Sequence, residues 1–297
     1  MSVFLIHILK SSVCLALFYL CYRILLSKET FHRFNRLALL GIMVLSFLLP
    51  FIEVTMQKMP EMTQPFLLLE EAMETVEVKR LDVLTETPKH FPWSALVFLI
   101  YASGILFFLL RHVWSMGRML CLLRTCRKEK REDGITLYVH RVKVAPFSWM
   151  KKIAISEDDL AKHGEAILAH ERAHIRLCHS YDKIFCEVVV RLLWFVPFGW
   201  MLREDLSDIH EYEADRSVLD AGFDIREYCL LLIHRATHPN MMPVVNAFNE
   251  SKTRQRMARM FQPKSSGRSA LKALYLLPLA AVAIVATAEP KQEKKLD

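Results

Sequence analysis

The stretch A-H-E-R-A-H at residues 169–174 is the part of the chain around which the rest can be arranged. It contains an H-E-x-x-H motif, in which His170 and His174 lie four residues apart and would leave the same face of a helix. Two imidazoles at this spacing suit one tetrahedral zinc ion, and Glu171 beside them could take a proton from a water molecule. The motif predicts a metal centre, and the alternative interpretation is a charged helix face with two ordinary histidines.

The residues before the motif are typical of the start of a helix. Ser156 is a predicted N-cap, and acidic residues fill positions 157–159, where the helix dipole favours negative charge. Apolar residues follow at Leu160, Ile167, Leu168, Ile175 and Leu177. No proline interrupts residues 156–177, so we expect one helix that carries the motif.

A second motif offers the third protein ligand that a catalytic zinc site needs. The sequence E-Y-E-A-D at residues 211–215 puts Glu211 and Asp215 one helical turn apart. Glu211 could bind the metal, and Asp215 could accept the free N–H of a ligating imidazole and fix its tautomer. The alternative is a solvated acidic helix with two like charges four residues apart.

Further polar residues lie close to these motifs in the sequence. His179 and Asp182 could support the metal ligands, although capping or surface roles are more typical of such positions. A developing oxyanion needs a second electrophile, for which His179, His210 and Tyr212 are the candidates. Cys178 is also near, but a thiol ligand is unnecessary when two histidines and a glutamate are available.

Apolar blocks alternate with charged blocks along the chain. Hydrophobic residues make up 53% of the 297 residues although 24% are charged. Blocks at 3–26, 37–52, 93–114 and 270–288 each predict a membrane-spanning helix. The first block has no basic segment before it and no small-residue cleavage site after it, which argues against a signal peptide.

The distribution of Lys and Arg predicts the orientation of these helices. The first connection carries Arg23, Lys28, Arg33 and Arg36. A second basic group precedes the fourth block and contains Lys252, Arg254, Arg256, Arg259, Lys264, Arg268 and Lys272. Residues 53–91 contain eight acidic residues against four basic ones and should lie outside. We therefore expect the zinc region in the cytoplasm and both termini outside.

The formal net charge of +7 is explained by this topology. Basic blocks that flank membrane spans can lie against anionic lipid headgroups, so anionic lipids are expected partners. Direct nucleic-acid binding is not expected, because no binding motif accompanies the basic stretch. The seven cysteines show no C-x-x-C spacing and none falls in the outer loop, which predicts free thiols rather than disulfides.

The region around the motifs predicts a mixed α and β domain. Residues 135–155 alternate between apolar and polar and should form two or three strands. An apolar helix is expected at 181–200, with an internal pair of Glu187 and Arg191. That pair and the P-F-G sequence at its end favour a buried or membrane-abutting helix over a fifth span. Another helix is expected at 225–235, followed by a break at 246–249.

At this point the chain resembles a known family. H-E-R-A-H, the W-F-V-P sequence at 194–197 and E-Y-E-A-D look like the BlaR/MecR-type integral-membrane zinc metallopeptidases, the antirepressors of the beta-lactam sensor-transducer type. The resemblance covers about residues 137–278. Val196 stands where the family usually has Asn, and Ala214 stands where it usually has Cys, although the related Ste24/HtpX type also carries Ala there. By resemblance, His170, His174 and Glu211 are the zinc ligands, and Glu171 is the catalytic acid and base.

The resemblance implies a mainly α membrane protein with four transmembrane helices. Residues 1–133 would form the membrane region. Residues 134–262 would form a cytoplasmic α+β gluzincin-like zinc peptidase domain, inserted between helices 3 and 4, in which an extended peptide substrate adds to a sheet edge. Residues 263–297 would hold a basic flank, the fourth helix and a short outer tail. No S-x-x-K motif follows residue 288, so a penicillin-binding sensor is not expected.

The implied activity is zinc-dependent endopeptidase action in signal transduction. The substrate would be a cytosolic transcriptional repressor or the chain itself, cut in response to an envelope signal at a bacterial-type inner membrane, and the protein could act as a homodimer. The first alternative is a housekeeping protease of the Ste24/HtpX type, in which we would expect membrane spans between the zinc histidines and the glutamate. The second is a non-catalytic scaffold, which would not need His170, Glu171, His174 and Glu211 intact.

Overall fold

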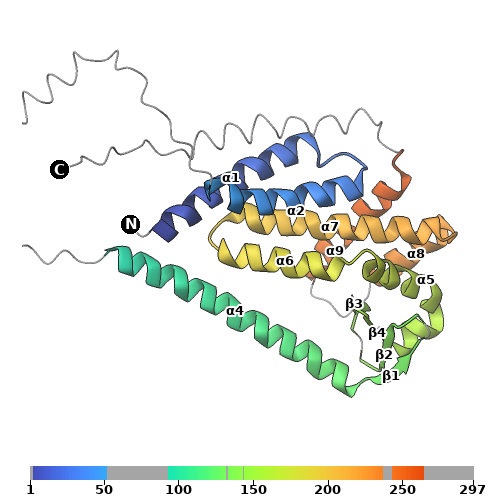
Figure 1. The fold of residues 1–297 in the computed structure, drawn as a ribbon. Coiled ribbons are helices and arrows are strands. Elements are labelled where there is room, and N and C mark those ends of the chain that lie inside the picture. Colours follow the sequence, from blue (N-terminus) through green and yellow to red (C-terminus); the bar gives the residue numbers. More distant parts are fainter. Residues whose placement is uncertain (1–2, 52–92, 132, 143, 237–242, 264–297) are drawn as a thin grey trace, which may run out of the picture.

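The computed structural model describes residues 3–51, 93–131, 133–142, 144–236 and 243–263. Most of these residues are helical, and one small sheet lies at one end of the molecule (Figure 1). The predicted outer loop at 53–91 and the predicted fourth span at 270–288 lie outside the described residues.

Three helices are long and apolar enough to cross a membrane, judged by length and composition. They are α1 (Val3–Leu25), α2 (His32–Leu48, continued by the short helix η1, Leu49–Phe51) and α4 (Trp93–Thr125). These helices coincide with the first three predicted spans. Helix α2 begins before the predicted start at residue 37, so Arg36 is a helical residue. Helix α4 continues past residue 114 because Met, Leu and Arg residues with high helix propensity follow the apolar stretch.

The helix predicted at 181–200 is two helices. Helix α6 (His179–Leu192) ends before the W-F-V-P sequence, and α7 (Pro197–Asp220) begins at its proline. Proline has no backbone N–H and is favoured in the first turn of a helix, which explains the new start. Glu187 and Arg191 form the predicted ion pair at 2.6 Å. Together α6 and α7 make a hairpin that joins the two halves of the predicted zinc site.

This hairpin runs alongside the candidate membrane helices (Figure 1). Its apolar side chains share one core with α1 and α2, which includes Leu15, Phe18, Leu39, Val190, Leu193 and Leu202. At the end of α6, the Tyr101 hydroxyl of α4 donates to the Leu192 carbonyl at 2.9 Å. A Cβ atom at Gly104 would lie 2.3 Å from the Trp194 ring, so glycine is what allows the hairpin to approach α4 this closely.

The sheet contains four strands in the order β1-β2-β4-β3, namely β1 (Arg127–Lys130), β2 (Thr136–His140), β3 (Phe147–Trp149) and β4 (Lys152–Ser156). β2 and β4 pair in parallel, whereas the two edge strands are antiparallel to their neighbours. The strands predicted within 135–155 are present. β1 lies before the predicted domain start at 134 and was not predicted, because R-K-E-K carries the charges typical of an exposed edge strand and no apolar alternation.

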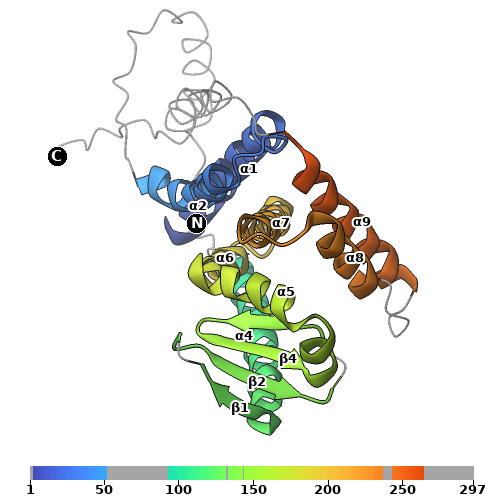
Figure 2. The same ribbon diagram turned by 90° about the vertical axis from the view of Figure 1, so that its right-hand side faces the viewer.

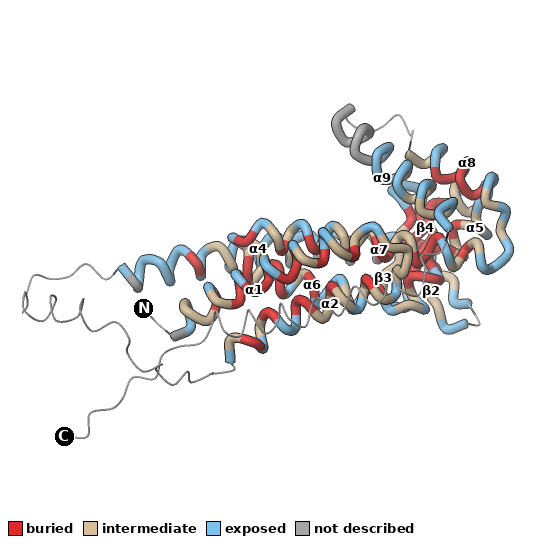
Figure 3. The backbone as a smooth tube through the Cα atoms, turned by 90° about the horizontal axis from the view of Figure 1, so that it is seen from above, coloured by how far each residue is buried: buried red, intermediate tan, exposed pale blue. Residues whose placement is uncertain are grey.

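A second hydrophobic core lies between the sheet and the remaining helices. Leu137, Val139, Ile153 and Ile155 pack with residues of α5 (Glu157–Arg176), α7 and α8 (Ile225–Ala236). Helix α9 (Pro243–Phe261) packs on α7 and α8 and runs straight through residues 246–249, so the predicted break there is wrong. Figure 3 shows buried residues in both cores.

Helix α7 belongs to both cores. Its buried residues Leu206 and Ile209 face α1, α2 and α6, whereas Val218 faces the sheet and α8. Figure 2 shows α7 nearly end-on, between α1 and α2 on one side and α5 and α6 on the other. The E-Y-E-A-D sequence therefore lies where the core shared with α1, α2 and α6 meets the core shared with the sheet and α8.

Candidate metal centre

The H-E-x-x-H motif lies near the C-terminal end of α5, a helix that begins directly after its predicted N-cap residue. The Ser156 hydroxyl accepts a hydrogen bond from the Asp159 backbone N–H at 3.0 Å, which confirms the predicted N-cap. His170, Glu171 and His174 are all buried. After the helix ends, Cys178 adopts a left-handed conformation with φ of 60°, and this turn leads directly into α6.

Three predicted ligands come together between α5 and α7. The Nε2 atoms of His170 and His174 lie 3.1 Å apart. Glu211 reaches both, with one carboxylate oxygen 3.4 Å from the His170 Nε2 and the other 3.6 Å from the His174 Nε2. One ligand atom from each of the three residues can be chosen so that all lie within 4.8 Å of one another.

These separations fit a tetrahedral zinc ion. Two ligand atoms that each lie about 2.0–2.1 Å from such an ion are separated by about 3.3 Å. The 3.1 Å between the two histidine nitrogens is close to this value, and Glu211 approaches them at 3.4 and 3.6 Å through its two different oxygens. Two imidazole nitrogens and one carboxylate are also the donor set of one class of catalytic zinc site, which leaves the fourth position for water or substrate.

Glu171 lies beside the cluster without belonging to it. It follows His170 directly and precedes His174 by one helical turn, and it is 5% exposed. Its side chain is therefore largely removed from solvent, and its place in the motif next to His170 makes it the candidate proton acceptor.

Tyr228 and Asp215 set the orientation of the His170 ring. The Tyr228 hydroxyl donates to an Asp215 carboxylate oxygen at 2.8 Å and lies 2.9 Å from the His170 Nδ1. Because the phenolic hydrogen is used on the carboxylate, the His170 Nδ1–H must donate to the Tyr228 oxygen. In neutral His170 this tautomer leaves the Nε2 lone pair directed at the cluster. Asp215 itself is 3.4 Å from Nδ1, so Tyr228 is the closer partner.

Arg256 completes this side of the site from α9. Its guanidinium binds both oxygens of Asp215, at 2.8 and 2.5 Å, and approaches the Glu211 carboxylate at 3.0 Å. Sequence reasoning assigned Arg256 to the basic membrane flank and Tyr228 to an apolar helix face. No local pattern distinguishes either residue from its neighbours, because their roles depend on how α8 and α9 pack against α7.

A parallel set of contacts orients the His174 ring. The His179 Nε2 lies 2.9 Å from a Glu213 carboxylate oxygen, and the His179 Nδ1 lies 2.8 Å from the His174 Nδ1. A carboxylate only accepts, so His179 must carry its proton on Nε2 and, when neutral, can only accept at Nδ1. The His174 Nδ1–H then donates to His179, and the His174 Nε2 keeps its lone pair for the cluster.

Arg36 of α2 holds the carboxylates on this second side. Its guanidinium contacts Asp182 at 2.5 Å and Glu213 at 3.3 Å. Asp182 also accepts a hydrogen bond from the His210 Nε2 at 3.0 Å. The structure therefore places Asp182, a predicted supporting residue, beside Arg36 and His210 rather than beside a predicted ligand.

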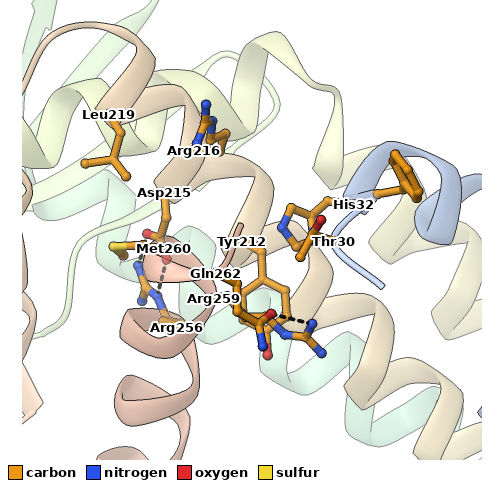
Figure 4. Close-up of a pocket in the computed structure, with 11 residues that line it drawn as sticks. Thr30, His32, Tyr212, Asp215, Arg216, Leu219, Arg256, Arg259, Met260 and Gln262 are labelled. Atoms are coloured by element: carbon orange, nitrogen blue, oxygen red, sulfur yellow. Dashed lines mark hydrogen bonds and ion pairs between the residues drawn. The ribbon is translucent and has the colours of Figure 1, made fainter. Parts of the chain in front are cut away.

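The predicted oxyanion candidates have other partners. His179 is hydrogen-bonded to His174 and Glu213, and its ring stacks on that of His210 at 4.1 Å. Tyr212 lines a cavity of about 180 Å³ between the α1–α2 turn, α7 and α9 (Figure 4). There its ring lies below the Arg259 guanidinium, 5.6 Å from centroid to Cζ.

Burial and neighbouring charges shift the pKa values of His170 and His174 in opposite directions. Burial alone would lower the pKa of His170, but hydrogen bonds to Asp215 and Glu211 raise it to about 9. Burial and the neighbouring His170 lower the pKa of His174 to about 2. Burial would raise the pKa of Glu211, but the His170 hydrogen bond and the Arg256 charge hold it well below 4.5. Because imidazoles that bind a metal must be neutral, a metal ion at this site would compete with the His170 proton.

No model of a known protein family matches this chain, and neither does any curated protein. The candidate site is therefore identified from its own side chains and not from a matching relative. His170, His174 and Glu211 converge, Glu171 follows His170 in α5, and Asp215 lies 3.4 Å from the His170 Nδ1, whereas Asp182 binds Arg36 and His210. The seven cysteines are free thiols, as predicted.

Proposed function

We propose that this protein is a membrane-embedded zinc metalloendopeptidase. The observation that carries the proposal is the convergence of His170, His174 and Glu211, in which each histidine is turned so that Nε2 faces its partners. A scaffold would not need two independent hydrogen-bonded sets to orient two adjacent imidazoles. The resemblance to the BlaR/MecR-type peptidases supports the same conclusion.

The proposed roles of the residues follow from their positions. Zinc, when bound, would polarise a peptide carbonyl and make a water molecule acidic. Glu171 accepts the proton of the attacking water and returns it to the leaving amine. Asp215 and Tyr228 hold the His170 ring, and His179 and Glu213 hold the His174 ring. The short edge strand β3, next to β4 in the sheet, offers backbone groups with which an extended substrate could pair.

The proposed topology and cellular location build on the three candidate membrane spans. We propose a fourth span at 270–288, an inner-membrane location with the gluzincin-like domain on the cytoplasmic side, and contact of the basic flanks with anionic lipids. On this topology the substrate is a cytosolic transcriptional repressor or the chain itself, cut in response to a signal from the envelope.

The test compares new protein N-termini in cells that express wild type, Glu171→Gln or Glu165→Gln at equal levels. Glu165 is an exposed residue on the same helix and provides the matched control. We expect one or two cuts that depend on Glu171 and persist in the Glu165→Gln cells. Identical N-termini in wild-type and Glu171→Gln cells, under every envelope stress applied, would remove the peptidase proposal.

One observation favours a second candidate function, proteolytic quality control of membrane proteins. The α6–α7 hairpin joins His174 to Glu211 and packs on α1, α2 and Tyr101 of α4, all of which belong to candidate membrane spans. A metal site connected in this way could act on substrates within or close to the bilayer. The same experiment separates the two functions, since quality control predicts many Glu171-dependent cuts spread over membrane proteins.

A further inference from the structure

A chain of hydrogen-bonded side chains connects the candidate membrane helix α2 with the metal cluster. It runs from Arg36 to Glu213 at 3.3 Å, from Glu213 to His179 at 2.9 Å, and from His179 to the His174 Nδ1 at 2.8 Å. His179 is 1% exposed, the Glu213 side chain 4% and the Arg36 side chain 17%, so solvent competes little for these contacts. The chain therefore provides a largely buried path from α2 to a predicted metal ligand.

Arg36 contacts the helix that carries His174 and the two helices, α6 and α7, that pack against it. It donates to the backbone carbonyl of Leu177, which caps α5 just after the motif, at 2.7 Å. It pairs with Asp182 in the first turn of α6 and with Glu213 in the middle of α7. One guanidinium thus fixes how the ends of α5 and α6 lie against α7, and its planar fork suits several simultaneous acceptors.

One carboxylate oxygen of Glu213 accepts two hydrogen bonds. The Glu213 Oε2 accepts from both Arg36 and His179. Among the described residues, no hydrogen-bond partner meets the other oxygen, Oε1. The position of Oε2 therefore depends on Arg36 and in turn determines where the His179 ring can lie, and the His179 ring determines which way His174 turns its Nε2.

We propose that Arg36 is a positioning residue for His174, through which the placement of the membrane helix α2 controls the geometry of the metal centre. The inference rests on the proposed metal centre but not on peptidase activity. It assigns α2 a role beyond membrane anchoring, because a shift of α2 relative to α7 would withdraw the guanidinium from Glu213. Outer contacts of this kind are typically worth about 10–100-fold in metal affinity.

The experiment uses the full chain purified in detergent, freed of metal and titrated with zinc against a chromophoric chelator. The variants are Arg36→Gln and the matched control Arg33→Gln, which removes an exposed positive charge from the same helix. We expect zinc affinity to fall about tenfold in Arg36→Gln and to stay at the wild-type value in Arg33→Gln. Cobalt(II) bound to Arg36→Gln should show a changed visible spectrum, since that spectrum reports ligand geometry rather than stability.

A double variant tests whether the effect passes through Glu213. Glu213→Gln should lower zinc affinity by a similar factor, and Arg36→Gln/Glu213→Gln should be no weaker than Glu213→Gln alone. Equal affinities and spectra for Arg36→Gln and Arg33→Gln would overturn the inference, and so would losses that multiply in the double variant. If Arg36→Gln does not fold, Arg36→Lys takes its place, because a lysine keeps the charge but cannot reproduce the three contacts.

The outcomes also separate this inference from the proposed function. A wild-type protein that binds zinc but makes no Glu171-dependent cut would remove the peptidase proposal and leave the Arg36 comparison fully measurable. A wild-type protein that makes such cuts, with zinc affinity insensitive to Arg36, would remove the inference alone.

Discussion

Arg256 and Asp215 form a two-point ion pair across the interface of α9 and α7. The guanidinium Nε and Nη2 lie 2.8 and 2.5 Å from the two carboxylate oxygens, and the Asp215 side chain is 1% exposed. Through Asp215 and Tyr228 this pair reaches the His170 ring. Helix α9 therefore contributes to the candidate metal centre without supplying one of its three predicted ligands.

Replacing Arg256 should destabilise the protein. Arg256→Gln leaves the buried Asp215 carboxylate without its compensating charge, which typically costs about 3–5 kcal/mol in unfolding free energy. The measurement is denaturant unfolding of the purified protein, with Arg254→Gln as control because Arg254 is exposed on the same helix. A similar stability for the two variants would contradict the role given to the ion pair.

Removing the Tyr228 hydroxyl should weaken metal binding more than it weakens the fold. Tyr228→Phe keeps the ring and its packing but deletes the group between Asp215 and His170. We expect about a tenfold loss of zinc affinity and a stability loss of about 1 kcal/mol. Chelator competition and thermal unfolding measure the two quantities. Tyr181→Phe, at a 58% exposed position, should change neither, and wild-type affinity in Tyr228→Phe would show that Asp215 orients His170 directly.

The packing of the hairpin on α4 can be tested with two glycines of one helix. A Cβ atom at Gly104 would lie 2.3 Å from Trp194, whereas at Gly117 nothing lies within 4 Å. Overpacking of this kind costs about 1–3 kcal/mol, so Gly104→Ala should lower the unfolding temperature while Gly117→Ala leaves it unchanged or slightly raised. Truncating the ring in Gly104→Ala/Trp194→Leu should recover part of the loss. Equal behaviour of the two alanine variants would mean that the hairpin does not rest on α4 at this point.

Acid should remove the stabilisation that Asp182 provides. Burial would raise the pKa of Asp182, but hydrogen bonds from His210 and Arg36 hold it below its ordinary value in the folded protein. A carboxyl group with a depressed folded-state pKa stabilises the fold above its unfolded pKa of about 3.9, and this contribution disappears as the pH falls through the folded pKa. Asp182→Asn should therefore be less stable than wild type by about 2 kcal/mol at pH 7.

That difference between wild type and Asp182→Asn should shrink as the pH falls below about 4. Unfolding free energies at a series of pH values from 7 to 3 provide the measurement. Asp220→Asn, at a position whose side chain is 63% exposed, is the control and should follow wild type throughout. A difference that stays constant down to pH 3 would mean that the Asp182 charge is not what stabilises the fold.

The local elements of the site were predictable because their signals lie within one helical segment. The Ser156 cap, the acids that follow it and the four-residue spacing of His170 and His174 depend only on neighbours in sequence and on the period of the α-helix. The apolar blocks that became α1, α2 and α4 are equally local, since membrane-spanning length and composition can be counted along the chain. The break at 246–249 was wrongly predicted because propensities of single residues do not decide whether a helix packed on α7 and α8 continues.

By itself, the sequence determined which residues could bind a metal and which segments could form helices, because both depend on residue type and short spacing. Only the tertiary structure decided which distant groups orient those ligands. Arg36 and Arg256 look like ordinary flanking charges in the sequence, and they become parts of the site because α2 and α9 both pack on α7. The physical reason is that a hydrogen bond needs contact within about 3 Å, and packing of whole helices, not local propensity, brings such side chains together.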